Sequence, residues 1–416
     1  MFPIFSLNEL KKIVIVTSGQ PSANPRAVKE ALLLANFNFS VTFIYCEISS
    51  WADVFDKDLI SKNRNIQWIK VGCHSIKQPL LFKLVRLRAK FFKGIYKIFR
   101  NNVNVCIKAS VLFAQELERE TKRHKAELYI AHNLGALQAA YLGAKKFNGK
   151  LGFDAEDFHR GEFNEIETQY QRTKTIENKY FPLVNYCTVA SPLIGAAYGE
   201  IFSKSKFTII NNVFSKKFAQ KVNVNNQTDS LNLFWFSQHI GTNRGLENVI
   251  LAINICKSLN INLHLLGNVK PEFKTILKDL IHDESKLIFH HPVSLENIFE
   301  IASQFEVGLA SEECLNKNKE YALSNKIFTY LLAGNCILYS NTPAQALFHS
   351  QNPETGFIYK VDDCEQLSKI LIELFNNREA LNQMRKNAFE VGIKKFNWEI
   401  EGQFFLSFVN NTLQIV

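Results

Sequence analysis

The sequence predicts an α/β protein made of two doubly wound domains with parallel sheets, and three observations point to it. Short apolar runs, typical of strands buried on both faces, alternate with helical patterns along nearly the whole chain. This alternation occurs twice, and a polar stretch at residues 215–230 separates the two halves. A chain of 416 residues is also longer than one ordinary core supports, so we expect two domains facing each other across a cleft.

The first half opens with a strand–helix–strand unit. Lys12–Thr17 has the composition of a buried strand, a polar loop follows, and Arg26–Asn36 has helical spacing. Val41–Tyr45 is the second strand, and so short a connection predicts parallel pairing with a right-handed crossover. Later strands of this half are expected at Leu128–Ala131, Lys150–Phe153, Tyr186–Ala190 and Thr208–Ile210.

The second half repeats the alternation. Its expected strands are Leu231–Phe236, Asn262–Leu266, Leu287–Phe289, Val307–Leu309 and Cys336–Tyr339. A last helix, Trp398–Leu413, follows the completed pattern, and we expect residues 398–416 to pack back on the first domain. The predicted domains are therefore residues 1–214 and 231–397, with residues 215–230 as the linker.

Composition narrows the class of protein. Apolar residues make up 46% and charged residues 21% of the chain, which is typical of a globular protein. The eight cysteines are scattered singly, a pattern that favours reduced thiols in a cytoplasm over disulfides or a zinc site. We find no signal-peptide pattern and no run near the ~20 apolar residues that cross a bilayer. We therefore expect a cytoplasmic protein that is soluble or lies on a membrane surface.

The positive charge is concentrated in the first half. Residues 1–230 hold 33 Lys and Arg against 19 Asp and Glu, whereas residues 231–416 hold 16 against 20. The basic half is therefore expected to meet an acidic partner. Nucleic acid is the weaker candidate, because no recognised binding module accompanies the charge.

A basic amphipathic helix is predicted over Leu81–Ile107. Apolar residues recur along it at helical spacing, and between Lys83 and Lys108 there are eight basic residues and no acidic one. This pattern is typical of a segment that lies in an anionic membrane interface, although an apolar face covering the sheet would also produce it. The predicted membrane residues are Lys83, Arg86, Lys90, Lys93, Lys97 and Arg100.

Two cations stand where a parallel sheet binds anions. Arg244 and Gly245 occupy a polar loop between the first strand of the second half and the next helix. Such a loop aims backbone N–H groups, and here a guanidinium, at an anion above the sheet. Lys326 opens another helix behind Ser324 and Asn325, which are expected to cap it. Arg244 and Lys326 together predict a site for a diphosphate. The alternative is that each is an ordinary surface cation at the start of a helix.

Polar residues near other strand ends are further candidates. Glu312, Glu313 and Glu320 lie between the strand Val307–Leu309 and the Lys326 helix, where one carboxylate is expected to bind ribose or sugar hydroxyls. Ordinary solvated loop charge is the alternative. No second set of ligands at useful spacing indicates a metal.

In the first half, His132 and Asn133 follow one strand, and Glu156, Asp157 and His159 follow the next. Polar groups at successive strand ends meet at one rim of a parallel sheet, where they could position a sugar and an acceptor hydroxyl. A polar loop with carboxylates at a helix start would give the same sequence.

Several stretches resemble a bacterial GT-B glycosyltransferase of the group 1 (family 4) kind. They are WFSQHIGTNRGLE, the segment from LASEE to ALSNKIFTYLLAGN, the closing FNWEIE and, more loosely, SGQPSANPRAVKEA, AHNLGAL and DAEDFHRGE. The resemblance covers nearly the whole chain. It implies two Rossmann-like domains, with a UDP- or GDP-linked sugar donor in the second and a glycan or lipid-linked acceptor in the first. It also implies retaining hexosyl transfer in cell-surface polysaccharide synthesis, at the inner face of the membrane, without metal or other cofactor.

The resemblance assigns roles to individual residues. Arg244 and Lys326 match basic residues of the family's donor site, and His132 matches a histidine that contacts the transferred sugar. The donor-binding residues expected on this basis are Gly19, Gly241, Arg244, Glu312, Glu313, Glu320, Ser324, Asn325 and Lys326. The acceptor-side residues are Asn133, Glu156, Asp157 and His159.

The match departs from the family at three positions. Tyr321 and Thr329 stand where the family often has two glutamates eight positions apart, and His239 stands where a basic residue usually precedes Arg244. Two alternatives to transfer therefore stay open. A nucleotide-sugar epimerase would need no acceptor and no basic helix. A non-catalytic protein that binds nucleotide-sugar or glycan is favoured by Thr329 and disfavoured by the retained cations.

Overall fold

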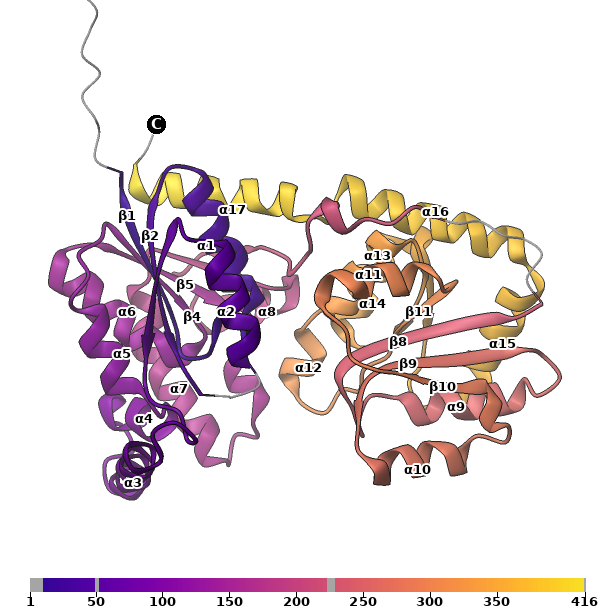
Figure 1. Ribbon diagram of the computed structural model, residues 1–416, viewed down its shortest axis with the longest axis horizontal. Helices are drawn as coiled ribbons and strands as arrows, with labels where there is room; N and C mark the ends of the chain where they lie inside the picture. The colour runs from indigo at the N-terminus through magenta and orange to yellow at the C-terminus, as the bar shows by residue number, and fades with distance from the viewer. Residues whose placement is uncertain (1–9, 49–51, 223–228, 415–416) are drawn as a thin grey trace, which may run out of the picture. The chain divides into compact units, whose positions relative to one another are not determined.

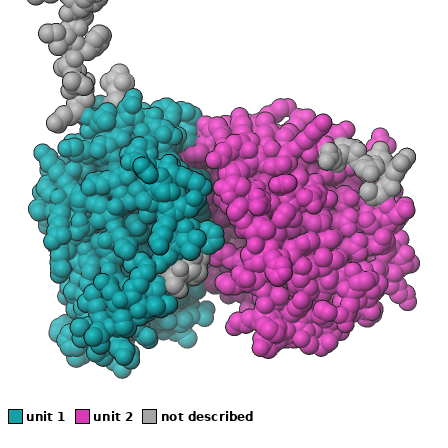
Figure 2. Space-filling model, in the orientation of Figure 1, with its two compact units in different colours: residues 1–210, 402–416 teal, residues 211–401 magenta. Residues whose placement is uncertain are grey.

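The computed structural model describes residues 10–48, 52–222 and 229–414, and the chain divides into two compact units. Unit 1 comprises Met1–Ile210 and Gly402–Val416, and unit 2 comprises Asn211–Glu401 (Figure 2). Each unit contains one sheet whose strands are all parallel, with helices between successive strands (Figure 1). The predicted class, two doubly wound α/β domains, is confirmed.

The sheet of unit 1 has seven strands in the order β3-β2-β1-β4-β5-β6-β7. They are β1 (Lys12–Thr17), β2 (Ser40–Cys46), β3 (Ile66–Val71), β4 (Leu128–His132), β5 (Lys150–Ala155), β6 (Tyr186–Val189) and β7 (Phe207–Ile209). The order reverses between β1 and β4, and their register pairs Thr17 with His132. Side chains at this switch point therefore gather where ligands of such sheets bind.

Among the described residues of unit 1, eight α-helices connect these strands. They are α1 (Pro25–Asn36), α2 (Ala52–Lys62), α3 (Pro79–Tyr96), α4 (Val103–Ser110), α5 (Ala114–Thr121), α6 (Leu134–Phe147), α7 (Thr168–Tyr180) and α8 (Pro192–Ile201). The sequence sets the start of α1 because Asn24 accepts a hydrogen bond from the Ala27 N–H and Pro25 fixes the first helical φ.

The sheet of unit 2 has six strands in the order β10-β9-β8-β11-β12-β13, with the switch point between β8 and β11. They are β8 (Leu231–Ile240), β9 (Ile261–Val269), β10 (Leu287–His290), β11 (Val307–Ala310), β12 (Cys336–Ser340) and β13 (Gly356–Tyr359). The helices are α9 (Leu246–Ile255), α10 (Pro271–Leu280), α11 (Leu295–Ser303), α12 (Lys317–Tyr321), α13 (Asn325–Ala333), α14 (Pro343–Gln351), α15 (Cys364–Asn376) and α16 (Arg378–Lys394).

Helices bury both faces of this second sheet. Trp235 of β8 packs with Val249 of α9 and Leu371 of α15, whereas the neighbouring Phe234 packs with Tyr330 of α13. Successive side chains of a strand point to opposite faces, so an unbroken apolar run marks a strand covered twice. Because most strands are covered on both faces, the apolar runs in the sequence predicted most of them.

The sequence missed two strands and placed some boundaries differently. Strands β3 and β13 were not predicted, and β8 continues past Phe236 to Ile240 through an irregularity in its pairing with β9. Of the predicted linker, residues 223–228 lie outside the described residues. The part before them belongs to unit 2, where the Phe218 ring stacks on Phe299 with centroids 5.1 Å apart.

The last helix, α17, spans Trp398–Leu413, as the sequence predicts. Its Gly402–Leu413 portion belongs to unit 1, and Lys11 Nζ donates a hydrogen bond to the Leu413 carbonyl at 2.7 Å. Phe405 and Val409 of this portion are fully buried.

Candidate functional site

In unit 2, hydrogen bonds from the segment after β11 fix the loop between β8 and α9. Gly245 adopts a left-handed φ of 67°, and a Cβ there would lie 2.5 Å from Ser311 Oγ. Ser311 Oγ donates to the Arg244 carbonyl, and the Gly245 N–H donates to Glu313 Oε1 at 3.0 Å. The loop therefore needs glycine at 245, and it is fixed at the switch point of the sheet.

The two predicted cations meet on one carboxylate. Arg244 Nη1 lies 3.0 Å from Glu312 Oε2, and Lys326 Nζ lies 2.8 Å from Glu312 Oε1. A third cation, Lys319 Nζ, lies 4.0 Å from Glu312 Oε2. The side chain of Arg244 is 32% exposed, whereas those of Lys326 and Glu312 are 9% and 11% exposed. The structure thus brings Arg244, Lys326 and Glu312 together in a half-buried cluster.

The cluster is strongly positive around its carboxylate. Burial would raise the pKa of Glu312, but Lys326, Lys319 and Arg244 together lower that pKa to about 2. Lys326 Nζ also lies 5.0 Å from the centroid of the Trp235 ring, within cation–π range. Lys326 is therefore held in place by an ion pair and by an aromatic face.

The other predicted donor residues are not all part of this cluster. Glu320 pairs with Lys317 at 2.6 Å. Ser324 is the N-cap residue of α13 by position, but its side chain makes no capping hydrogen bond, and Asn325 is the first helical residue. A Cβ on Gly241 would meet open space.

Gly19 belongs to unit 1, where its N–H donates to Thr17 Oγ1 at 3.3 Å.

Thr329 cannot take the part of a carboxylate. It is 1% exposed, and its hydroxyl donates to the Asn325 carbonyl one turn earlier in α13, at 3.3 Å. His239 is exposed on β8.

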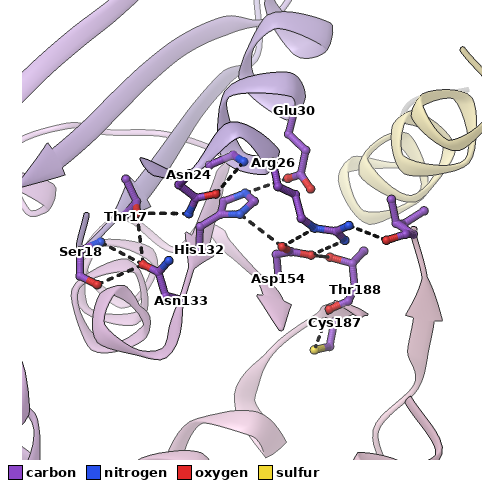
Figure 3. A network of polar contacts seen from close by, with 12 residues as sticks. Thr17, Ser18, Asn24, Arg26, Glu30, His132, Asn133, Asp154, Cys187 and Thr188 are labelled. Atoms are coloured by element: carbon purple, nitrogen blue, oxygen red, sulfur yellow. Dashed lines mark hydrogen bonds and ion pairs between the residues drawn. The ribbon is translucent and has the colours of Figure 1, made fainter. Parts of the chain in front are cut away.

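In unit 1, His132 lies in a buried network of charged side chains (Figure 3). Its Nε2 is 2.9 Å from Glu30 Oε2 and its Nδ1 is 3.3 Å from Asp154 Oδ2. Arg26 donates to both oxygens of Asp154 at 2.7 Å, and to the Ile210 carbonyl. His132 is 1% exposed and both ring nitrogens face carboxylates, so the sugar contact expected for it stays a prediction.

The network keeps His132 charged. Burial would lower the pKa of His132, but Glu30 and Asp154 raise it to about 10. Burial would likewise raise the pKa of Asp154, whereas Arg26 and His132 hold it well below its usual range. Burial raises the pKa of Glu30 against the opposing effect of His132 and Arg26, so Asp154 is the firmly ionised carboxylate of the network. The sequence analysis missed Arg26 and Glu30, because their position on one face of α1 is also that of an ordinary helix in contact with a sheet.

Three of these side chains are close enough to share a metal ion. Glu30, His132 and Asp154 each place a ligand atom within 4.8 Å of the others. Arg26, however, already occupies Asp154, and a divalent cation would be repelled by that guanidinium and by a charged His132. The residues fit a salt-bridge network better than a metal site.

The predicted acceptor-side residues occupy two places in unit 1. Asn133, at φ 59°, accepts hydrogen bonds from Thr17 Oγ1 at 3.1 Å and Ser18 Oγ at 3.0 Å, which ties the ends of β1 and β4 together. Figure 3 shows this link beside the charged network.

Glu156, Asp157 and His159 follow β5. Burial raises the pKa of Glu156. Burial would lower the pKa of His159, but Glu162, whose Oε1 lies 3.3 Å from Nδ1, raises it.

Helix α3 packs beside α4 (Figure 1). Its side chains form three stripes along the helix. The inward stripe consists of Val85, Ala89, Phe92 and Tyr96. The exposed apolar stripe consists of Leu80, Leu84, Leu87 and Phe91. The exposed basic stripe consists of Lys83, Arg86, Lys90 and Lys93, and Lys97 extends it just past the end of the helix. At 3.6 residues per turn, the two exposed stripes run side by side on the outward half of the helix.

The predicted helix over Leu81–Ile107 is wrong in its extent. α3 ends at Tyr96, and Arg100 lies in the loop before α4. Asn102 explains the break, because its side chain caps a new helix by accepting from the N–H groups of Asn104 and Val105. The alternative that the apolar residues cover the sheet is also wrong for Leu84, Leu87 and Phe91, which are 62%, 60% and 63% exposed. No helix among the described residues is long and apolar enough to span a membrane.

Two Rossmann-like units with parallel sheets and helices on both faces define the GT-B fold, and comparison with solved structures agrees. No protein-family model matches the sequence, and no curated protein matches it either. A sucrose-phosphate synthase from Thermosynechococcus elongatus superimposes with a TM-score of 0.69 at 13% identity, over 96% of this chain and 100% of that one. A glycosyltransferase from Rickettsia africae gives 0.67 at 13% identity, over 98% and 100%.

The Anabaena protein Alr3699/HepE, crystallised with UDP and glucose, gives a TM-score of 0.68 at 11% identity, over 96% of this chain and 100% of that one. The chain therefore has the GT-B fold of known glycosyltransferases along nearly its whole length.

Proposed function

We propose that this protein is a glycosyltransferase that moves a hexosyl group from a UDP- or GDP-linked sugar to a glycan or lipid-linked acceptor in cell-surface polysaccharide synthesis. The observation that carries the proposal is the convergence of Arg244 and Lys326, 3.0 and 2.8 Å from one carboxylate, at the switch point of the unit 2 sheet. This is the place where doubly wound sheets bind phosphates. Neighbouring structures support the donor class, since HepE was crystallised with UDP and with UDP-glucose.

The chemistry follows from charge development. When the bond between the anomeric carbon and the β-phosphate oxygen breaks, the leaving nucleoside diphosphate gains negative charge. Arg244, Lys326 and the N-terminus of α13 would stabilise that charge, and one preorganised donor of this kind contributes about 3 kcal/mol. In a retaining reaction, the departing phosphate oxygen takes the proton of the acceptor hydroxyl while the acceptor oxygen bonds to the anomeric carbon. Such a step needs no protein nucleophile.

Nucleotide binding by the wild type and by the Arg244→Ala, Lys326→Ala double variant tests the donor site. UDP, GDP, ADP and CMP would be compared by thermal shift, since a ligand at a hundredfold excess over Kd stabilises the fold by about 2.7 kcal/mol. We expect one diphosphate to raise the wild-type Tm and to have no effect on the double variant. Lys278→Ala, which removes an exposed lysine paired with Glu284, is the control. An equal shift in the double variant would contradict the proposal.

One observation favours a non-catalytic nucleotide-sugar-binding protein as the second candidate. Thr329 supplies no carboxylate, and its hydroxyl is already bonded within α13. Turnover separates the two candidates. Release of UDP or GDP from the sugar nucleotide, with or without an acceptor, supports transfer, whereas binding without any release supports the second candidate.

We also propose that the protein works on the cytoplasmic face of the cell membrane through α3. Adjacent exposed apolar and basic stripes on one helix match an interface in which apolar side chains enter the bilayer and lysines remain among anionic headgroups. An open hollow of about 500 Å³ beside Lys97 and Arg100 offers room for a headgroup. Sedimentation with phosphatidylcholine vesicles, with and without phosphatidylglycerol, tests this, and we expect binding only to the anionic vesicles.

A further inference from the structure

Glu312 engages both proposed phosphate-binding cations at once. Its Oε1 faces Lys326 Nζ at 2.8 Å and its Oε2 faces Arg244 Nη1 at 3.0 Å, so the carboxylate bridges the two. Its backbone N–H donates to Ser340 Oγ at 3.1 Å, which fixes the main chain from which the side chain extends. Within the described part of unit 2, this carboxylate therefore occupies the contacts that an incoming diphosphate needs.

We infer that Glu312 is an internal competitor of the donor's diphosphate, which must displace this carboxylate from Arg244 and Lys326 in order to bind. The inference rests on the proposed donor site and adds a residue that regulates it. The sequence predicted instead that one of Glu312, Glu313 and Glu320 contacts sugar or ribose hydroxyls, without deciding which.

The charges of the cluster make displacement necessary. Arg244, Lys319 and Lys326 supply three positive charges, and Glu312 supplies the carboxylate that faces all three. The nearby Glu313 is bonded to the Gly245 N–H instead. A diphosphate brought against the same cations would place like charges next to Glu312 in a half-buried site, where repulsion is stronger than in water.

Competition of this kind also selects ligands. A ligand with two phosphate groups can replace both contacts of Glu312, whereas a single phosphate replaces them less completely. The internal carboxylate therefore raises the preference for a diphosphate over a monophosphate. It also keeps Arg244 and Lys326 positioned when no donor is bound.

Glu312→Gln tests the inference, with inorganic pyrophosphate, phosphate and UDP as probes in isothermal titration calorimetry at neutral pH. We expect the variant to bind pyrophosphate at least about tenfold more tightly than the wild type, which corresponds to 1.4 kcal/mol. We also expect the ratio of pyrophosphate to phosphate affinity to fall. Glu390→Gln, an exposed carboxylate paired with Lys394 in α16, is the matched control and should leave both affinities unchanged.

Tighter pyrophosphate binding by Glu312→Gln distinguishes competition from a purely structural role of Glu312. If Glu312 only supported the two cations, its removal would lower the affinity. Unchanged or weaker pyrophosphate binding by Glu312→Gln overturns the inference, and so does a lack of pyrophosphate binding by both forms. If pyrophosphate binding tightens but neither form binds a nucleoside diphosphate, the inference stands and the proposed donor site fails.

If Glu312→Gln does not fold, Glu312→Asp replaces it, since the shorter side chain keeps its charge but cannot bridge both cations. Its pyrophosphate affinity should exceed that of the wild type, and a lower affinity overturns the inference.

Discussion

Charge reversal on α3 tests how the protein meets a membrane. Lys90, Lys93 and Lys97 are all exposed on the basic stripe, and no acidic residue lies between Lys83 and Lys108. Each basic side chain near an anionic surface contributes about 1 kcal/mol, so replacing these three lysines with glutamate removes about 3 kcal/mol. Repulsion between the three new carboxylates and the anionic surface weakens binding by a further amount of similar size. The partition coefficient onto anionic vesicles should therefore fall by about 10²–10⁴-fold.

The assay is sedimentation with vesicles containing phosphatidylglycerol, at low salt and at about 0.5 M salt, where exposed charges are screened. The matched control reverses Lys145, Lys146 and Lys150, three exposed lysines elsewhere in unit 1, with the same change in net charge. Binding should survive in the control and disappear in the α3 variant. Equal losses in both variants would mean that net charge rather than α3 directs binding, and unchanged binding of the α3 variant would refute the reasoning.

The apolar stripe has its own test. Leu84, Leu87 and Phe91 are each about 60% exposed, and burying such a side chain fully contributes about 1.5–3 kcal/mol. Inserting their exposed parts should therefore contribute roughly 1–2 kcal/mol each. Leu84→Asn together with Leu87→Asn should weaken vesicle binding at every salt concentration, whereas the charge-reversal effect shrinks as salt rises. A loss that salt abolishes would contradict the insertion of these side chains.

Two further predictions concern the interior of each unit. Asp154→Asn leaves Arg26 buried without its paired anion and leaves His132 with Glu30 alone, and it should lower the free energy of unfolding of unit 1 by about 3–5 kcal/mol, measured by urea denaturation. Because Glu30 and Asp154 raise the pKa of His132 to about 10, the stabilisation from its charge is complete below pH ~6.5 and should be lost as pH rises through about 10, a loss that shrinks in the variant, where only Glu30 remains. Gly245→Ala forces a Cβ at φ 67° to within 2.5 Å of Ser311 Oγ, and strain of about 1–3 kcal/mol should weaken UDP binding. A Gly245→Ala variant with wild-type affinity would show that the loop does not depend on this glycine.

Much of the fold was readable from the sequence because buried strands leave a strong local signal. The run Leu231–Phe236 is apolar on both faces apart from Asn232, and the structure covers both faces with helices. The missed strand β3 shows the limit of that signal. At the edge of the sheet, only its end residues Ile66 and Val71 are buried, and a half-covered edge strand has no continuous apolar run.

The site was predictable in its cations but not in their pairing. Arg244 and Lys326 were found from their places at a strand–helix loop and a helix start, which are local features. Glu312 was also a candidate, but its pairing with both cations was not predicted, because it is separated from Arg244 by 68 residues in sequence and only the β8–β11 switch brings them together. The same holds for His132 and Glu30, which are 102 residues apart. The charge of a side chain is known from the sequence, whereas the residue with which it pairs depends on the order of the strands in the sheet.

The charged network around His132 in unit 1 and the cluster around Glu312 in unit 2 differ in solvent exposure, and this difference bears on whether each can bind an anion. In unit 1, Arg26 and His132 are buried and already paired with Asp154 and Glu30. An anion from solvent would have to enter the interior and break these pairs before it could bind either cation. In unit 2, Arg244 is 32% exposed, and one carboxylate faces three cations. A surplus of positive charge that solvent can reach attracts an anion, whereas a buried balance holds strands together. The switch point of unit 1 thus holds a buried salt-bridge network, whereas that of unit 2 holds a solvent-accessible excess of positive charge, which is the feature on which the proposed exchange of Glu312 for phosphate rests.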